Sequence, residues 1–328
     1  MRLVRGALLL LGAALLVALV VRDDPGAILA SLARVGWGFA ILVVFPMVLV
    51  TWFDTLGWRY AFLDDRVPFR ALLTARLAGE AFNLTTPTAA LGGEAVKAWL
   101  IRTHALLDAS VASVVVAKTT ITLAQGLFLL AGVAVAWAIR LPSSPVLQGM
   151  QWLLLVEALA LGGFVWIQTR GLFGRLGTVL ERVGLGAPTG RAALGGIDAG
   201  LREFWLRAPR RVALSILYHL VAWLLGVVEA WLILRFLGAD VTLGTATVIE
   251  AFGAAIRFAT FLIPGSLGAM EGGYAATFAA LGLGSTTGLT FSLVRRVREA
   301  VWIALGLVAF GLTRPPAPTP TPTGHRRS

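Results

Sequence analysis

The chain has 328 residues, of which 58% are hydrophobic and 14% are charged, and its mean hydropathy is +0.83. Soluble domains carry about 25% charged residues, so this composition excludes a water-soluble protein and indicates a lipid environment. The net charge is +11, there is no cysteine, and the three histidines lie far apart in the sequence. Disulfides, thiolate metal sites and a cysteine nucleophile are therefore excluded, and we expect no metal, cofactor or nucleic-acid partner.

Six apolar runs are long enough to cross about 30 Å of hydrocarbon as helices. In chain order they lie near residues 5–21, 37–57, 110–138, 147–168, 212–234 and 286–312. Two further apolar segments, 70–103 and 243–283, are interrupted halfway by Gly, Pro and Thr, which is typical of re-entrant hairpins. The sequence therefore predicts an all-α polytopic membrane protein of about six transmembrane helices plus two re-entrant helical hairpins. We expect the first run to be kept as a span rather than cleaved as a signal peptide.

The distribution of basic residues predicts the orientation of the spans. If the N-terminus is cytoplasmic, the cytoplasmic connections hold 19 Lys and Arg residues and the outer connections hold four. Because cytoplasmic segments are enriched in Lys and Arg, we expect a multi-pass protein of the cell inner (plasma) membrane with both termini cytoplasmic. The polar stretch 170–211 is then a cytoplasmic loop, and the Pro- and Thr-rich segment 313–328 is a disordered cytoplasmic tail.

Three pairs of residues share one sequence offset, 177 positions. They are Pro87 and Pro264, Glu94 and Glu271, and Lys118 and Arg295. The halves 1–140 and 141–312 also have the same order of elements: two spans, a broken hairpin and a third span. Because three spans is an odd number, the second half starts on the opposite side of the membrane. The sequence therefore predicts an inverted-topology repeat, in which secondary transporters place their binding site near the midplane.

Several charged residues are predicted to lie near the bilayer centre. Lys118 lies about nine residues into its span, and the run from Arg295 to Glu299 lies about ten to fourteen residues into the last span. A central arginine costs at least about 2.5–3.5 kcal/mol, so we expect these side chains to face protein, water or an anionic ligand.

Helical spacing suggests how these charges pair. Glu299 lies one turn from Arg296, so this pair would leave the other two arginines of the run, Arg295 and Arg298, partly uncompensated and available to an anion. A structural salt bridge from Arg298 to Glu250 or Glu271 is an equal alternative.

The two breaks are predicted to supply further anion-binding groups. Half-helices that meet inside a membrane present free backbone N–H groups, which bind anions. Asn83 and Thr86 add side-chain donors at the first break, and Gly92–Gly93 permits close backbone approach. Glu94 and Glu271 fall in the first turn of the outgoing half-helices. They either cap those helices or pair with buried cations and take up a proton, and the sequence leaves both roles open.

Three motifs resemble a known family. They are NLTTPTAALGGEAVKAWLIR at residues 83–102, IPGSLGAMEGGYAATFAALGL at 263–283 and SLVRRVRE at 292–299. They look like the lysylphosphatidylglycerol synthase transmembrane region, also called the flippase-like family, and the last two are similar to its hopanoid-associated HpnL branch. The resemblance covers about residues 5–312. It implies a membrane domain that binds a lipid and moves the headgroup between leaflets.

The resemblance also bears on chemistry and on site residues. Family members that make lysyl lipids carry a soluble aminoacyl transferase domain, whereas this chain stops at Ser328, so the resemblance implies no lipid synthesis and no catalytic residue. The family motif adds Lys97, Arg257 and Gly268 to the candidates. The candidate headgroup-binding residues are Asn83, Thr86, Gly92, Gly93, Glu94, Lys97, Lys118, Arg257, Glu271, Arg295, Arg296, Arg298 and Glu299. The candidate hinge residues are Pro87, Pro264, Gly265 and Gly268. Weaker candidates are the lone ionisable residues Asp54, Glu157, His219 and Glu229.

Three functions fit these features. The first is a flippase or transporter that takes an anionic phospholipid, a polyprenyl phosphate or a hopanoid-type lipid through a basic cavity at the midplane. The second is an intramembrane transferase with Glu94 or Glu271 as general base. The third is an accessory subunit bound to lipid-biosynthesis enzymes, which a dry and fully salt-bridged interior would favour. The oligomeric state is not predicted.

Overall fold

The computed structural model describes residues 18, 21, 25–64, 67–86, 92–139, 145–170, 188–260 and 262–313. Within these ranges the chain forms eleven α-helices and one short 3-10 turn and contains no strand. The predicted all-α polytopic membrane protein is therefore confirmed. Nearly all of the first predicted span, residues 171–187 of the predicted loop and residues 314–328 of the predicted tail lie outside the described residues.

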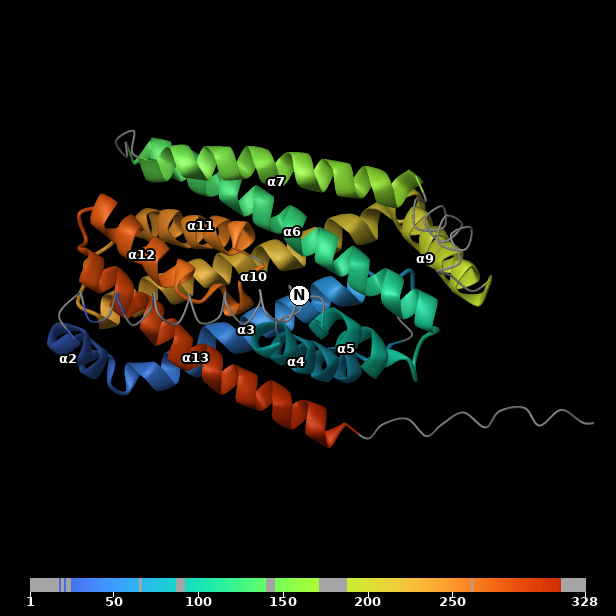
Figure 1. Ribbon diagram of the computed structural model, residues 1–328, viewed down its shortest axis with the longest axis horizontal. Coiled ribbons are helices and arrows are strands. Elements are labelled where there is room, and N and C mark those ends of the chain that lie inside the picture. Colours follow the sequence, from blue (N-terminus) through green and yellow to red (C-terminus); the bar gives the residue numbers. More distant parts are fainter. Residues whose placement is uncertain are drawn as a thin grey trace, which may run out of the picture.

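Five long helices run along the longest dimension of the molecule (Figure 1). They are α3 Gly38–Tyr60, α6 Leu107–Ala138, α7 Pro145–Arg170, α10 Pro209–Phe236 and α13 Ser285–Leu312. The first four are long and apolar enough to cross a membrane, α7 over Leu147–Arg170. They coincide with four of the six predicted spans. The last predicted span, 286–312, corresponds to α13, whose 28 residues include the charged run from Arg295 to Glu299.

Shorter helices form two hairpins. In the first, α5 Gly92–Ile101 packs back along α4 Phe69–Thr85, and in the second, α12 Ala269–Ala280 packs back along α11 Leu243–Ala259. Helices of 10 to 17 residues reach only about 15–26 Å, which is less than the hydrocarbon thickness. The chain thus turns back at both predicted breaks and does not continue as a kinked span. That each hairpin is re-entrant, and that the halves form an inverted repeat, stay predictions.

Glycine allows the helices of each hairpin to approach closely. A Cβ atom at Gly93 would collide with the backbone oxygen of Gly79, so α5 lies almost against the α4 backbone. In the second hairpin, the ring of Tyr274 occupies the space in which Gly253 lacks a side chain. Because these contacts involve the backbone or a buried ring, a larger residue would force the hairpins open.

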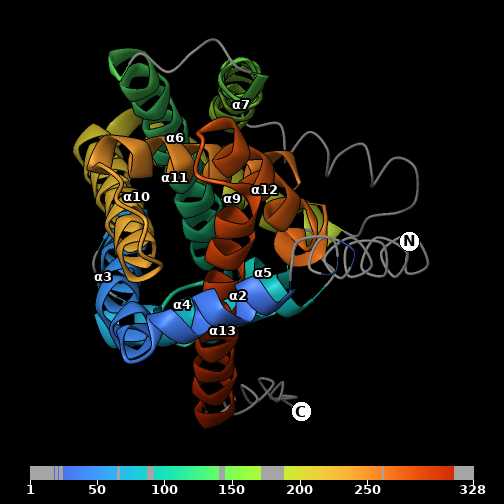
Figure 2. The ribbon, with the colours of Figure 1, turned by 90° about the vertical axis from the view of Figure 1, so that its left-hand side faces the viewer.

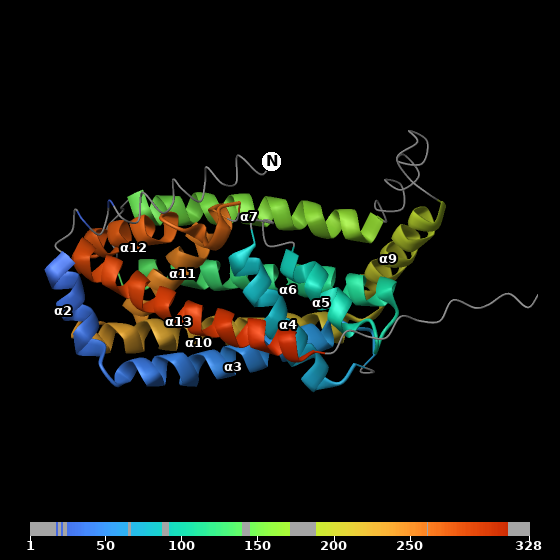
Figure 3. The same cartoon turned by 60° about the horizontal axis from the view of Figure 1, so that its bottom comes forward.

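The tips of the two hairpins meet. Leu84, near the end of α4, lies beside Gly265 in the 3-10 turn η1 Pro264–Ser266, which precedes α12. Figure 3 shows the pair α11–α12 toward one end of the molecule and the pair α4–α5 further toward the other. The described residue Leu84, just before the first interruption, therefore lies beside the second interruption at Gly265.

Two apolar clusters flank this meeting point. One joins α6, α10, α11 and α12 around Phe128, Ile249 and Phe278, and the other joins α3, α4, α5 and α6 around Trp58 and Leu72. Two further helices lie at the periphery: α9 Pro188–Arg207, inside the predicted cytoplasmic loop, packs on α6 and α7, and α2 Pro25–Val35 crosses in front of α13 (Figure 2). The two clusters leave room for polar groups between them.

A tight contact between α13 and α4 can be tested with one methyl group. A Cβ atom at Gly306 would collide with the backbone oxygen of Leu77, whereas a Cβ atom at Gly311 in the same helix would meet nothing within 4 Å. We expect Gly306→Ala to lower the free energy of unfolding by about 1–3 kcal/mol. Gly311→Ala should leave it unchanged or raise it slightly. Thermal unfolding in detergent measures both, and equal midpoints would contradict the packing described.

Candidate functional site

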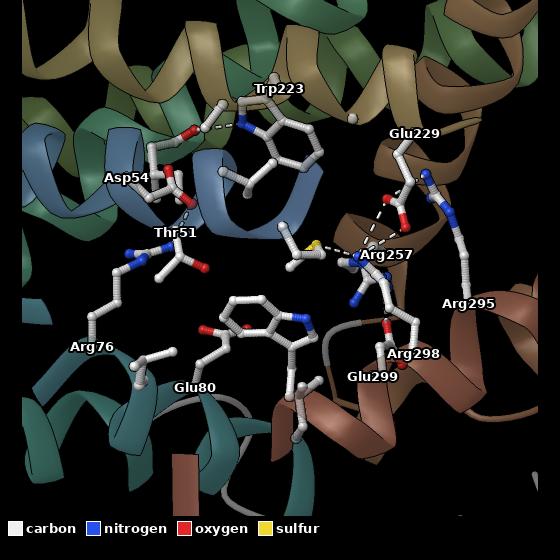
Figure 4. A pocket seen from close by; sticks show the side chains of 18 of the residues that line it. Thr51, Asp54, Arg76, Glu80, Trp223, Glu229, Arg257, Arg295, Arg298 and Glu299 are labelled. Atoms are coloured by element: carbon white, nitrogen blue, oxygen red, sulfur yellow. Dashed lines mark hydrogen bonds and ion pairs between the residues drawn. The ribbon is translucent and has the colours of Figure 1, made fainter. Parts of the chain in front are cut away.

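A cavity of about 320 Å³ lies between α3, α4, α6, α10, α11 and α13. Its walls carry ten ionisable side chains, most of them visible in Figure 4. They are Asp54, Arg76, Glu80, Lys118, Glu229, Glu250, Arg257, Arg295, Arg298 and Glu299. Such a concentration of charge between membrane helices marks this cavity as the candidate site, because charges in a membrane interior are costly and usually functional.

On one wall, α13 points two arginines at carboxylates of α10 and α11. Arg295 Nη2 lies 2.7 Å from Glu250 Oε2 and 3.3 Å from Glu229 Oε2, and Arg298 Nη1 lies 3.0 Å from Glu229 Oε1. Arg295 also donates to the hydroxyl oxygen of Tyr274 at 3.0 Å. Both arginines are buried, so they lie inside the protein rather than toward its surface.

The expectation that Arg295 and Arg298 are partly uncompensated is therefore wrong, because each pairs with carboxylates of other helices. Arg298 pairs with Glu229, not with Glu250 or Glu271 as the alternative supposed, and it contacts the sulfur of Met47 on α3. The difference has a physical cause: spacing along α13 gives neighbours on the same helix but not carboxylates that packing brings from another helix. The shared carboxylate comes from α10.

Arg296 points away from the cavity and holds the second hairpin tip. Its Nε donates to Glu271 Oε1 at 2.6 Å, and its Nη1 donates to the backbone oxygen of Gly265 at 2.7 Å. The predicted pair with Glu299 is present at 3.1 Å. Glu271 in turn accepts the backbone N–H of Gly268 at 2.7 Å, so it caps the start of α12.

Positive φ angles shape the same tip. Gly265 has a φ of +58° and Gly268 has a φ of +77°, which L residues with a side chain rarely adopt. The Pro264 backbone lies in η1, and Pro87 lies outside the described residues. The hinge role of all four residues stays a prediction.

Polar side chains of the first hairpin join α4 to α5 through hydrogen bonds and an ion pair. Asn83 Oδ1 accepts the backbone N–H of Gly93 at 2.9 Å, and Asn83 Nδ2 donates to Glu94 Oε1 at 3.0 Å. Lys97 Nζ lies 2.9 Å from the same Glu94 oxygen. Thr86 Oγ1 donates to the backbone oxygen of Phe82. These residues, and Gly92 at the start of α5, do not line the cavity of about 320 Å³, called the larger cavity below.

Glu94 and Lys97 instead border a second, smaller cavity of about 40 Å³. The charged residues Arg76, Glu80 and Lys118 line both cavities. Glu94 and Lys97 therefore lie next to the larger cavity, separated from it by side chains that line both, whereas Asn83, Thr86, Gly92 and Gly93 line neither.

A third cluster lies between α3, α4 and α10. Asp54 Oδ1 lies 2.7 Å from His219 Nδ1, and Asp54 Oδ2 lies 2.5 Å from Arg76 Nη2. Asp54 and His219 are both buried. The cluster reaches the cavity through Asp54 and Arg76 (Figure 4).

One comparison with known proteins identifies the family. The family model described as the lysylphosphatidylglycerol synthase TM region matches residues 4–306. The chain belongs to this family. No curated protein and no solved structure matches the chain. The family is thus shown as predicted, while the closer similarity to the HpnL branch stays a prediction.

In this member of the lysylphosphatidylglycerol synthase TM family, the prediction of a basic cavity is wrong. Its walls carry five cations, Arg76, Lys118, Arg257, Arg295 and Arg298, and five carboxylates, Asp54, Glu80, Glu229, Glu250 and Glu299. When all are ionised, the lining is neutral. The prediction was wrong because it weighed basic residues at the breaks and in α13 but not carboxylates from α3, α4, α10 and α11.

The pairing of these charges is uneven. Among the described residues, Glu80 and Lys118 make no ion pair with any side chain, and both are exposed. Arg257, on α11, has a loose partner, since its Nη2 lies 3.4 Å from Glu299 Oε1 and 39% of its side chain is exposed. The free charges thus lie on α4 and α6, while the charges of α10 and α13 are tightly paired.

Of the predicted site residues, five line the larger cavity: Lys118, Arg257, Arg295, Arg298 and Glu299. Asp54 and Glu229, which the sequence ranked as weaker candidates, line it too, whereas Arg76, Glu80 and Glu250 were missed as site residues. A usable signal was present. Arg76 and Glu80 lie one turn apart on a helix that is otherwise mostly apolar.

Removal of the shared carboxylate tests the paired wall. Glu229→Gln leaves two buried arginines with less compensation, so we expect the free energy of unfolding to fall by about 3–5 kcal/mol. The control is Asp240→Asn, which breaks a pair with Arg235 in which the aspartate side chain is 94% exposed; its cost should stay below about 1 kcal/mol. If unfolding in detergent shows equal losses, Glu229 does not bridge the two arginines.

Proposed function

We propose that this chain is a lipid flippase or transporter-like protein that takes a phosphate-bearing headgroup into the mixed-charge cavity while the acyl tails stay in the bilayer. The observation that carries the proposal is the cavity itself, with ten charged side chains between helices of a membrane protein. Membership of the lysylphosphatidylglycerol synthase TM family supports a lipid as the cargo.

The size of the cavity limits what can enter it. Small-molecule sites usually measure about 300–1,000 Å³, so 320 Å³ fits a headgroup and excludes a whole lipid with two tails. The outward faces of the long helices carry apolar side chains such as Trp152, Leu159 and Trp166, which suit contact with lipid tails. A headgroup inside and tails outside is therefore the arrangement that the walls favour.

The free and loosely paired cations are the natural phosphate ligands. Within the described part of the chain, Lys118 makes no ion pair that a phosphate would have to replace. The contact of Arg257 with Glu299 is long, at 3.4 Å, so a phosphate replaces Glu299 there most easily. Glu80 can accept a hydroxyl or ammonium donor of the same headgroup. The tight pairs of Arg295 and Arg298 would hold the wall in place.

The contact between the two hairpins is where we expect one half of the protein to move against the other. In transporters with inverted repeats, one repeat rocks against the other around a fixed site. Here Leu84 and Gly265 lie at the contact between the two tips, next to the cavity wall. We infer that this contact separates and reforms as the cavity opens to each leaflet. A cell inner (plasma) membrane with both termini cytoplasmic is part of the proposal.

Lys118 provides the test, because its loss should not disturb folding. We expect Lys118→Gln to slow lipid movement about 10- to 100-fold, since one charge-assisted contact of about 1.5–3 kcal/mol is removed. Lys118→Arg should keep most of the rate. The measurement is the movement of labelled phospholipid, polyprenyl phosphate, aminoacylated lipid and hopanoid between leaflets of proteoliposomes, with the recovered lipid checked for covalent change.

Arg235→Gln, which removes an equal charge at the end of α10, is the matched control. A normal rate in Lys118→Gln, or no movement of any lipid by the folded wild-type protein, would contradict the proposal. A covalently altered lipid would favour an intramembrane transferase instead.

A further inference from the structure

We propose that His219 binds a proton when a phosphate-bearing headgroup enters the cavity, so that lipid movement is coupled to proton movement. The inference rests on the proposed function and names the coupling ion of the same site. It is carried by the geometry of His219, Asp54 and Arg76 and by the small cavity beside them.

His219 has one ring nitrogen in use and one free. Nδ1 lies 2.7 Å from Asp54 Oδ1, and the other carboxylate oxygen of Asp54 accepts from Arg76 at 2.5 Å. Because the carboxylate is an acceptor, Nδ1 carries the hydrogen and Nε2 is left as an acceptor. Within the described residues, Nε2 is buried and has no hydrogen-bond partner. A buried acceptor without a partner is unusual and calls for a functional explanation.

A small polar cavity beside the ring is where we place the source of the proton. The His219 ring borders the cavity of about 40 Å³, which is large enough for a water molecule and is lined by polar side chains. The charged groups that face His219 are Asp54 from α3, Arg76 and Glu80 from α4, Glu94 and Lys97 from α5, and Lys118 from α6. Water in this cavity therefore has several polar partners beside the imidazole.

Arg76 links the histidine to the headgroup. It lines the larger cavity, where the headgroup would bind, yet it is also the only cation in a described ion pair with Asp54. A phosphate is a strong bidentate partner for arginine and would draw Arg76 away from Asp54. The buried carboxylate then lacks a cation, which is unfavourable, and protonation of His219 restores one.

The proton balance is simple. One proton from water in the small cavity forms an N–H bond at Nε2, no covalent bond breaks, and the positive charge of the imidazolium faces Asp54. The phosphate brings a negative charge into the site at the same time. Since binding free energies are reciprocal, a bound headgroup raises the affinity of His219 for a proton, and a bound proton raises the affinity of the site for the headgroup.

The ring also fits its place closely. A Cβ atom at Gly57 would come within 2.6 Å of His219 Nε2, so the glycine on α3 leaves the room that the imidazole occupies. A purely structural histidine would need only its Nδ1 bond to join α10 to α3. Ser215 already joins these two helices, because its hydroxyl donates to the backbone oxygen of Gly57. A nitrogen without a partner among the described residues, in a ring that borders a water-sized cavity, is what the structural role leaves unexplained.

The test compares His219→Asn with His104→Asn in purified full-length protein. Asparagine keeps a donor close to the Nδ1 position but cannot take up a proton. His104 lies on the exposed turn between α5 and α6, so the same substitution there is a matched control. Proton uptake on addition of short-chain phosphatidylglycerol is measured in weak buffer with a pH indicator. In proteoliposomes, the leaflet ratio of labelled phosphatidylglycerol is measured under a pH gradient of one unit.

We expect the wild type and His104→Asn to take up about one proton per bound lipid. Under the gradient, both should build a leaflet ratio approaching about tenfold, the limit for one proton per lipid. His219→Asn should bind lipid, take up no proton and give equal leaflets. Arg76→Gln should also lose lipid-linked uptake, because the group that transmits the effect is gone.

The outcomes separate the two proposals. If the wild type moves lipid but takes up no proton and ignores the gradient, the coupling is overturned and the flippase function stands. Proton uptake that persists in His219→Asn overturns the assignment to this residue. If His219→Asn does not fold, the wild-type proton count decides alone. If the wild type moves no lipid at all, the proposed function fails and the coupling fails with it.

Discussion

The structure depends on one constraint: a charged side chain buried inside a membrane protein needs a partner, and for the arginines of α13 most partners come from another helix. The arginines of α13 meet this constraint in two ways. Arg295 and Arg298 share Glu229 of α10, and Arg296 holds Glu271 and the backbone oxygen of Gly265 at the second hairpin tip. Because unpaired buried charges are costly, these contacts fix α13 against its neighbours. The interactions that hold the bundle together therefore also build the wall of the cavity.

The two sides of the cavity differ in a way that bears on function. The side formed by α10, α11 and α13 is mostly closed by ion pairs, whereas Glu80 of α4 and Lys118 of α6 are unpaired among the described residues. Arg76 of α4 pairs with Asp54 and also lines the cavity. A headgroup would therefore find its unpaired partners on α4 and α6 and one loosely paired cation, Arg257, on α11. The coupling proposed for His219 acts through Arg76, on the side with the unpaired groups.

Much of the fold could be predicted from the sequence. Long apolar runs predicted α3, α6, α7, α10 and α13, because a helix that faces lipid must be apolar over its length. The Gly and Pro interruptions predicted the two turns in the chain, since Pro ends helices and Gly permits positive φ. The pair Arg296–Glu299 also followed from spacing along one helix.

The site was predicted only in part, and the reason is physical. Spacing along one helix gives the neighbours of a residue on that helix but not its partners on other helices. Glu229 and Asp54 looked like lone charges in apolar helices, although one bridges two arginines and the other joins a histidine to an arginine. The prediction of a basic cavity failed for the same reason, because the compensating carboxylates come from helices far away in the sequence.

The central claim is that a water-accessible, headgroup-sized cavity lies between these helices. The chain contains no cysteine, so a single cysteine can be placed without removing another. Thr122→Cys puts a thiol on the cavity wall, and Leu159→Cys puts one on the exposed apolar face of α7. Thiolates form and react only where water reaches them. The account predicts that, in lipid bilayers, a charged water-soluble thiol reagent labels Thr122→Cys and leaves Leu159→Cys unlabelled. Failure to label Thr122→Cys in folded protein, or equal labelling of the two, would contradict it.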